Sequence, residues 1–193
     1  RDAKEGFDPF LDATKWYRIA PVKDNTRYLD VVGQQYKNGT PIGVWTRSNR
    51  NQEFQFKDAG NGYVTITVRG DPRYSIEILS FSKDSQMKLM ETDVNNPKQK
   101  FKLVLLPNGF YRIETSDPGF SILGVTNIYQ RPYLSTSNDI NLYQQWEITP
   151  VKWFRRQLSS YKPAASLQGR LIEKKEECRS APSRENWEGF FIV

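Results

Sequence analysis

The triplet Gln52-Glu53-Phe54 recurs twice further along the chain, as Gln99-Lys100-Phe101 and as Gln144-Gln145-Trp146. Each triplet reads Gln, any residue and then a large aromatic residue, and the three leading glutamines are 47 and 45 residues apart. Self-similarity at a fixed period is the sequence signature of a repeat architecture. The chain is therefore predicted to contain three copies of one structural unit.

Two further marks recur with nearly the same period. One is a tyrosine followed two or three residues later by isoleucine, at Tyr17, Tyr63 and Tyr111. The other is a triplet with apolar outer residues, centred on Asp30, Glu77 and Gly124. Between the marks, short apolar or alternating runs typical of strands are separated by turn clusters rich in Gly, Asn and Pro. About four short strands fit each unit, and three such units can close into a capped barrel without free sheet edges.

Composition excludes several classes of enzyme. The chain has 193 residues with no histidine and one cysteine. A chain without histidine has no Ser-His-Asp triad and no histidine-ligated zinc, and one cysteine cannot build a thiolate metal site. We therefore expect no enzyme activity, no cofactor and no metal site.

The positive charge lies mostly near the end of the chain. Of the net charge of +6, residues 152–193 carry nine Lys and Arg against five Glu. A nearly neutral body with a basic tail is a poor match for a nucleic-acid-binding domain, so no nucleic acid is expected as a partner. No apolar stretch is long enough to span a membrane. The tail shows no fourth repeat, and Trp153, Leu158 and Tyr161 fall at near-helical spacing. Cys178 is either a free thiol or a tether to a partner chain.

These repeats resemble the ricin-type (ricin B-like) β-trefoil lectins, a family of carbohydrate-binding modules. The resemblance covers about residues 15–150 and rests on the three triplets, whose aromatics are Phe54, Phe101 and Trp146. It implies an all-β fold, a β-trefoil whose repeats span about 15–60, 61–107 and 108–150. An N-terminal extension, 1–14, would precede the trefoil, and a basic, partly helical C-terminal extension, 151–193, would follow it. The glutamines, including Gln144, are expected to pin the loops of their repeats, because an amide both donates and accepts hydrogen bonds.

The resemblance also implies a sugar site in the first repeat. In this family a competent repeat binds sugar through an early Asp, a later aromatic residue and a polar residue before the signature Gln. Asp30, Trp45, Asn51 and Gln52 match that set. A carboxylate accepts strong hydrogen bonds from sugar hydroxyls, an amide completes the network, and an indole face covers the sugar's C–H patch.

The other repeats depart from the pattern. The second repeat has Glu77 and Gln99, but counting back from Gln99 puts Thr92 at the aromatic position, so a weaker site is expected there. The third has Gly124 at the acidic position and Ser137 at the aromatic one, with Tyr133 nearby. One principal site in the first repeat is therefore expected.

Two functions remain open from the sequence. The first is a secreted or extracellular lectin that binds cell-surface glycans, as the receptor-binding part of a toxin or of a secreted enzyme. The alternative is a β-trefoil that binds protein, as a protease inhibitor or assembly subunit whose sugar sites have decayed, with residues 151–193 as the contact to another chain. Fold alone does not separate the two.

Overall fold

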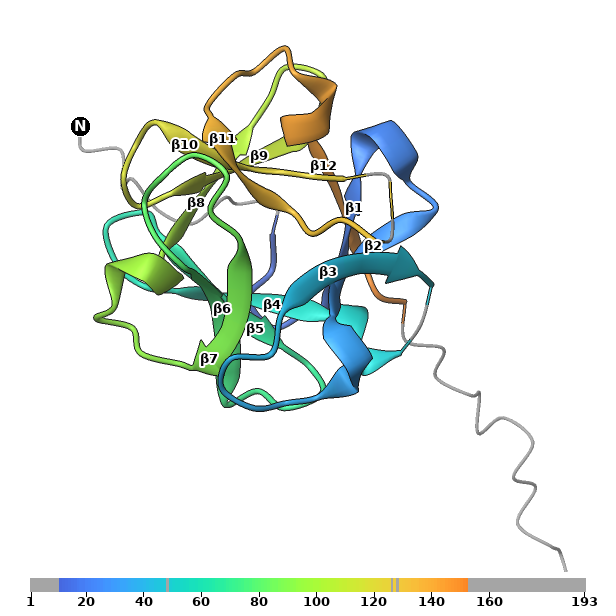
Figure 1. Cartoon of the computed structure of the whole chain (residues 1–193), viewed down its shortest axis with the longest axis vertical. Helices are drawn as coiled ribbons and strands as arrows, with labels where there is room; N and C mark the ends of the chain where they lie inside the picture. The colour runs from blue at the N-terminus through green and yellow to red at the C-terminus, as the bar shows by residue number, and fades with distance from the viewer. Residues whose placement is uncertain (1–10, 48, 126, 128, 153–193) are drawn as a thin grey trace, which may run out of the picture. The chain divides into compact units, whose positions relative to one another are not determined.

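The computed structural model describes residues 11–47, 49–125, 127 and 129–152, and these residues form an all-β domain of twelve short strands, four in each predicted repeat (Figure 1). The first repeat contains β1 (Tyr17–Pro21), β2 (Arg27–Val31), β3 (Ile42–Thr46) and β4 (Phe54–Asp58). The second contains β5 (Val64–Val68), β6 (Tyr74–Ile78), β7 (Met87–Glu91) and β8 (Phe101–Leu105). The third contains β9 (Tyr111–Thr115), β10 (Phe120–Leu123), β11 (Tyr133–Thr136) and β12 (Trp146–Pro150).

Helices are limited to single 3-10 turns in the described part of the chain. They are η1 (Val22–Asp24), η2 (Val32–Gln34), η3 (Arg50–Gln52), η4 (Pro97–Gln99) and η5 (Leu142–Gln144). None of them has the length and apolarity that a membrane-spanning helix requires. The helical pattern predicted after Pro150 and the site of Cys178 lie outside the described residues.

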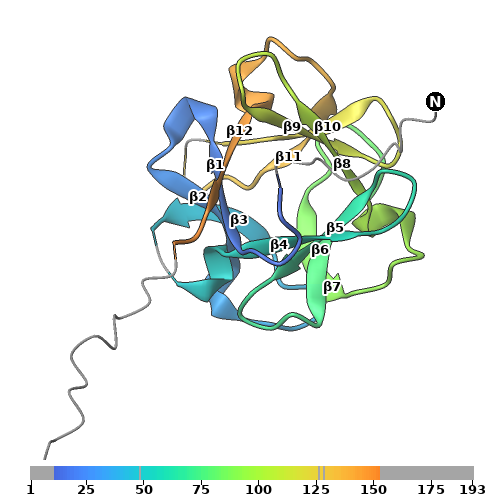
Figure 2. The same cartoon turned by 180° about the vertical axis from the view of Figure 1, so that it is seen from behind.

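Six strands close into a barrel, which is seen from its far side in Figure 2. Around the ring, β1 pairs with β4, β4 with β5, β5 with β8, β8 with β9, β9 with β12 and β12 with β1, all antiparallel. Closure leaves no free edge in the barrel. The other six strands form the hairpins β2–β3, β6–β7 and β10–β11, which cap one end. A six-stranded barrel capped by three hairpins is a β-trefoil, as predicted.

The three signature aromatics fill the barrel core. Phe54, Phe101 and Trp146 are fully buried, and each pairs with the first residue of its own repeat's first strand. In the second repeat that residue is Val64, so the prediction that Tyr63 is equivalent to Tyr17 and Tyr111 is off by one position. The indole Nε1 of Trp146 donates to the carbonyl of Ile122 across 3.0 Å, so its polar atom is satisfied inside the core.

The signature glutamines hold the hairpins to the barrel, as the sequence predicts. The amide nitrogens of Gln52, Gln99 and Gln144 each donate to the last carbonyl of the third strand of their repeat, at 2.7–2.9 Å. The amide oxygen of Gln99 accepts from the Asp93 N–H, and that of Gln144 accepts from the Asn138 N–H. All three glutamines are buried, so these bonds replace their lost contact with water.

Before the first strand, Leu11 is buried and belongs to the hydrophobic core cluster. Part of the segment that the sequence assigns to an N-terminal extension therefore packs against the barrel. The rest of that segment lies outside the described residues.

Candidate functional site

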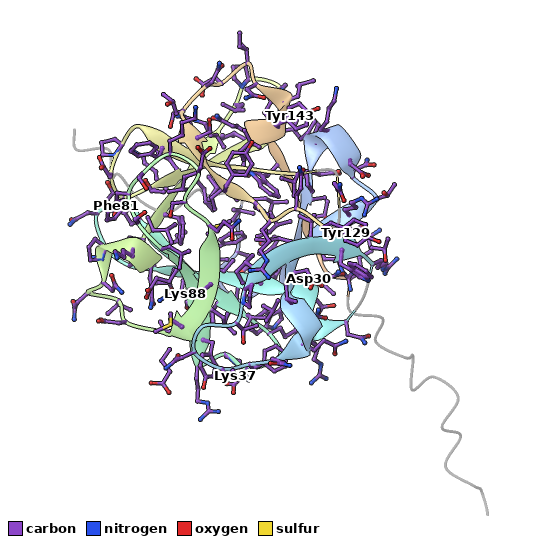
Figure 3. The ribbon with its side chains drawn as sticks, in the orientation of Figure 1. Asp30, Lys37, Phe81, Lys88, Tyr129 and Tyr143 are labelled. Atoms are coloured by element: carbon purple, nitrogen blue, oxygen red, sulfur yellow. The ribbon has the colours of Figure 1, made fainter. Side chains whose placement is uncertain are left out.

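A cavity of about 410 Å³ lies beside the β2–β3 hairpin of the first repeat. Its volume falls in the range typical of small-molecule sites, about 300–1,000 Å³. The lining residues come from the first repeat and from the β10–β11 connection of the third: Asp30, Val32, Gly33, Gln34, Gly43, Val44, Trp45, Asn51, Tyr129, Gln130 and Arg131. Figure 3 labels Asp30 and Tyr129, two residues from opposite ends of the trefoil sequence that share this cavity.

One oxygen of the Asp30 carboxylate is held from behind. The side-chain amides of Asn51 and Gln52 both donate to Asp30 Oδ2, across 2.8 Å and 2.9 Å. Oδ1 accepts no hydrogen bond from any residue that the structure describes. Burial raises the pKa of Asp30 from its ordinary 3.8 to about 6, and the hydrogen bonds from Gln52 and Asn51 oppose that rise. The carboxylate is thus fixed in place with one acceptor left for a ligand.

Trp45 supplies an apolar face next to this carboxylate. It lies on β3 and 48% of its surface is exposed, which is unusual for so large an aromatic side chain. Asp30 pairs with Gly43 across the hairpin, so no side chain stands between the carboxylate and the cavity at that position. An acceptor and a flat apolar surface therefore line the same hollow.

Asn51 adds a second acceptor. It lies on η3, and its Nδ2 donates to Asp30 Oδ2 at 2.8 Å and to the Val31 carbonyl at 3.4 Å. Its Oδ1 is buried and has no hydrogen-bond partner in the described part of the chain. A buried polar atom without a partner is costly, so a ligand hydroxyl that donates to it would be favoured.

Gln52 supports the carboxylate of Asp30 and does not itself line the cavity. It is fully buried and spans from Asp30 to the Thr46 carbonyl. Of the four residues predicted for the site, three line the cavity, and Gln52 positions the carboxylate of Asp30.

The second repeat keeps the supporting bond but covers its carboxylate. Gln99 and Asn96 each donate to Glu77 Oε2 across 3.0 Å. Glu77 pairs with Lys88 across its hairpin, and Lys88 Nζ lies 3.5 Å from Glu77 Oε1. The strand register puts Lys88 at the position of Gly43 and Met90, not Thr92, at that of Trp45. The second acidic side chain is therefore already engaged by a lysine of its own repeat.

In the third repeat, the residue predicted to be equivalent to Asp30 is displaced by one position. Leu29, Ile76 and Ile122 occupy one position, because they pair with Val44, Leu89 and Leu134 in the three hairpins. The next residue, Leu123, therefore stands where Asp30 does, and the prediction of Gly124 there is wrong. Gly124 instead lies against Trp146, where an added Cβ would come within 3.2 Å of Cη2.

The aromatic position of the third repeat is also shifted. Ser135, not Ser137, is equivalent to Trp45, since Thr46 and Thr136 both accept from the signature glutamine of their repeat. Counting back from the glutamines fails because Gln52 follows Thr46 by six positions, whereas Gln144 follows Thr136 by eight. The loop between the third strand and the glutamine is two residues longer in the third repeat, so the predicted position lies two residues too far along the chain.

Residues 129–131 line the cavity but were not predicted from the sequence. No motif marks this segment, and it reaches the first-repeat cavity only because the trefoil places the third repeat beside the first. The signal that could have found it is the cyclic order of the repeats, which makes each hairpin loop a neighbour of the next hairpin.

Comparison with known proteins agrees with this fold. Residues 10–86 match the sequence model described as the ricin-type beta-trefoil lectin domain-like family. No curated protein sequence matches the chain at a significant level.

Three solved structures illustrate the likeness in fold. The designed threefold-symmetric protein ThreeFoil aligns with a TM-score of 0.65 and 18% identity, over 70% of this chain and 99% of that one. The ricin B-like lectin of Macrolepiota procera, solved in complex with lactose, aligns with 0.60 and 16%, over 72% and 97%.

A mosquitocidal holotoxin aligns with a TM-score of 0.64 and 19% identity over 72% of this chain, which spans only 17% of that protein. The match over residues 10–86 and the shared fold thus confirm the resemblance to ricin-type β-trefoil lectins drawn from the repeats.

Proposed function

We propose that the chain is a carbohydrate-binding module whose principal site is the cavity lined by Asp30, Trp45 and Asn51. The observation that carries this proposal is that Asp30 Oδ1, which accepts no hydrogen bond from a described residue, lines one cavity with a half-exposed indole. A sugar offers hydroxyl donors on one side and C–H groups on a face, which match a carboxylate and an aromatic plane. The lactose complex of the Macrolepiota procera lectin, which has the same fold, supports this class of ligand.

Binding, not catalysis, is the role that we propose for the site. Asp30 is the one carboxylate among the described residues that line the cavity, so the paired acid and base of a glycosidase are not found there. Its rigid support by Asn51 and Gln52 suits recognition, since a fixed acceptor loses little conformational entropy when it binds.

The experiment that tests the proposal is a glycan array probed with the purified chain and, in parallel, with Asp30→Asn. Wild type is expected to bind a defined set of glycans, and the variant is expected to lose that set. If wild type binds no glycan on the array, the carbohydrate proposal fails. The alternative, a protein-binding trefoil, would then lead.

We further propose that the module works outside cells, as the part of a toxin or secreted enzyme that attaches it to cell-surface glycans. The match to one segment of a mosquitocidal holotoxin supports this role. Labelled protein should bind intact cells, and enzymatic removal of surface glycans should abolish that binding. Equal binding before and after glycan removal would contradict the proposal.

A further inference from the structure

Backbone hydrogen bonds close two of the three junctions between the capping hairpins. From the first repeat to the second, Gly39 N–H donates to the Leu89 carbonyl at 2.8 Å, and Leu89 N–H donates to the Thr40 carbonyl at 2.7 Å. From the second repeat to the third, the same two bonds join Asp84 and Ser85 to Leu134, both at 2.8 Å. Each hairpin loop is thereby fastened to the third strand of the next repeat.

The third junction is built differently. By the same register, Tyr129 and Gln130 should bond to Val44, yet no hydrogen bond joins these described residues. The register of β2 with β3 turns the Val44 N–H and carbonyl away from β2 and toward this junction. The 410 Å³ cavity, which all three residues line, lies here instead. The candidate site therefore occupies a junction that the other two repeats keep closed.

Two further hollows share lining residues with this cavity. A second hollow of about 470 Å³ is lined by Gln86, Tyr129, Gln130, Arg131 and Tyr133. A third, of about 260 Å³, shares Gln130 and Tyr133 with it. The three hollows, which share lining residues and are together called the groove here, offer room for more than one sugar unit.

The groove carries positive charge. Arg131 lines the first two hollows, is exposed, and has no ion pair with any described residue. Arg47 and Arg50, in the segment between Trp45 and Asn51, also have no ion pair within the described chain. Arg73, by contrast, is paired with Asp71 at 2.7 Å. Arg131 is therefore a guanidinium without an ion pair among the described residues, in a cavity whose one described carboxylate is Asp30.

We propose that the groove binds an acidic oligosaccharide, with one unit held at Asp30 and an anionic group of a neighbouring unit paired with Arg131. The inference rests on the proposed function and specifies its ligand class. A guanidinium makes two parallel N–H···O bonds to a carboxylate or a sulfate, a geometry that favours arginine over lysine. Tyr129, 89% exposed at the same groove, presents a ring on which the second unit can stack.

The test uses an array of neutral oligosaccharides printed beside otherwise identical chains that carry a carboxylate in one arm and a sulfate in the other. The best neutral glycan and its acidic counterparts are then titrated against wild type, Arg131→Gln and Lys83→Gln. Lys83 is the matched control, since it is exposed in the corresponding loop of the second repeat and lies outside these hollows. The measured quantity is the ratio of the neutral to the acidic Kd.

Wild type and Lys83→Gln are expected to prefer one acidic arm by about fivefold, the scale of a solvent-accessible ion pair, and added salt should reduce the preference. Arg131→Gln should lower the ratio to about one. If wild type binds neutral glycans with no preference for either acidic arm, or if Arg131→Gln keeps the wild-type ratio, the acidic-ligand inference is wrong and the proposed function stands. If wild type binds neither neutral nor acidic glycans, the proposed function itself fails.

Discussion

Gln52 donates its side-chain amide to Asp30 Oδ2 across 2.9 Å, and both side chains are buried. The same glutamine also holds the Thr46 carbonyl, so one residue ties the end of β3 to the carboxylate on β2. The amide of Gln52 therefore contributes both to the position of the Asp30 carboxylate and to the attachment of β3. A substitution at Asp30 therefore changes ligand binding and domain stability in ways that depend on the residue introduced.

Asp30→Asn is expected to keep stability and remove binding. An asparagine oxygen can accept the bonds from Asn51 and Gln52, while the charged acceptor that faces the cavity is lost. Asp30→Ala, by contrast, removes the acceptor of one N–H from each of two buried amides, Asn51 and Gln52, and should destabilise the domain by about 1–3 kcal/mol for each. Thermal melting of both variants checks this difference. Equal melting temperatures for the alanine variant and wild type would contradict the supporting role of these bonds.

Ligand affinity should fall as the pH is lowered through about 6. Burial raises the pKa of Asp30 to about 6, so the carboxylate that accepts sugar hydroxyls is protonated below that pH. Titrations of wild type between pH 4.5 and 8, at constant ionic strength, measure the effect. An affinity that stays flat across this range would show that the ionised carboxylate is not the group that binds.

Stability should change in the opposite sense. A carboxyl whose pKa is raised on folding binds its proton more tightly in the folded state, so its contribution to stability is greatest at low pH and falls as pH rises from about 4 to 6. The difference in unfolding free energy between wild type and Asp30→Asn, which has no such proton, isolates this contribution. If that difference does not shift in favour of wild type as pH falls from 6 to 4, the raised pKa is wrong.

Two tryptophans should separate function from folding. Trp45→Ala is expected to weaken glycan binding by at least about tenfold and to change stability little, because the indole is 48% exposed. Trp146→Ala should cost about 3–5 kcal/mol of stability, since that side chain is fully buried at the barrel core. Chemical denaturation and glycan titration of the pair make the comparison. A large loss of stability in Trp45→Ala would place its indole in the core instead.

Gly70 is expected to be required for the packing of Tyr36. A Cβ at position 70 would lie 1.9 Å from Tyr36 Cζ, so Gly70→Ala forces the ring to move. Overpacking of this kind typically costs about 1–3 kcal/mol. In a Tyr36→Ala background the same glycine substitution should cost almost nothing, as a double-mutant cycle would show. An undiminished cost in that background would assign the effect to the backbone of Gly70.

The features that could be predicted from the sequence are those that recur in each repeat or lie within one repeat. The triplets ending in Phe54, Phe101 and Trp146 identified the trefoil because each copy makes the same contact in the core. Asp30, Trp45 and Asn51 could be predicted together because they belong to one repeat. Equivalent positions in the other repeats were predicted wrongly because the loops between strands differ in length. Equivalence is defined by the hydrogen-bonded register of the strands and not by counting residues. Arg131 was missed because its place beside Asp30 depends on the arrangement of the repeats around the barrel.

One paired titration tests most directly whether the principal sugar site is the cavity at Asp30 and not the equivalent position of the second repeat. The glycan that wild type binds best is titrated calorimetrically against Asp30→Asn and Glu77→Gln, two isosteric changes at equivalent positions of the first and second repeats. Since Lys88 already engages Glu77, Glu77→Gln should bind like wild type, whereas Asp30→Asn should weaken binding by at least about tenfold. Wild-type affinity in Asp30→Asn, or a loss confined to Glu77→Gln, would contradict the account.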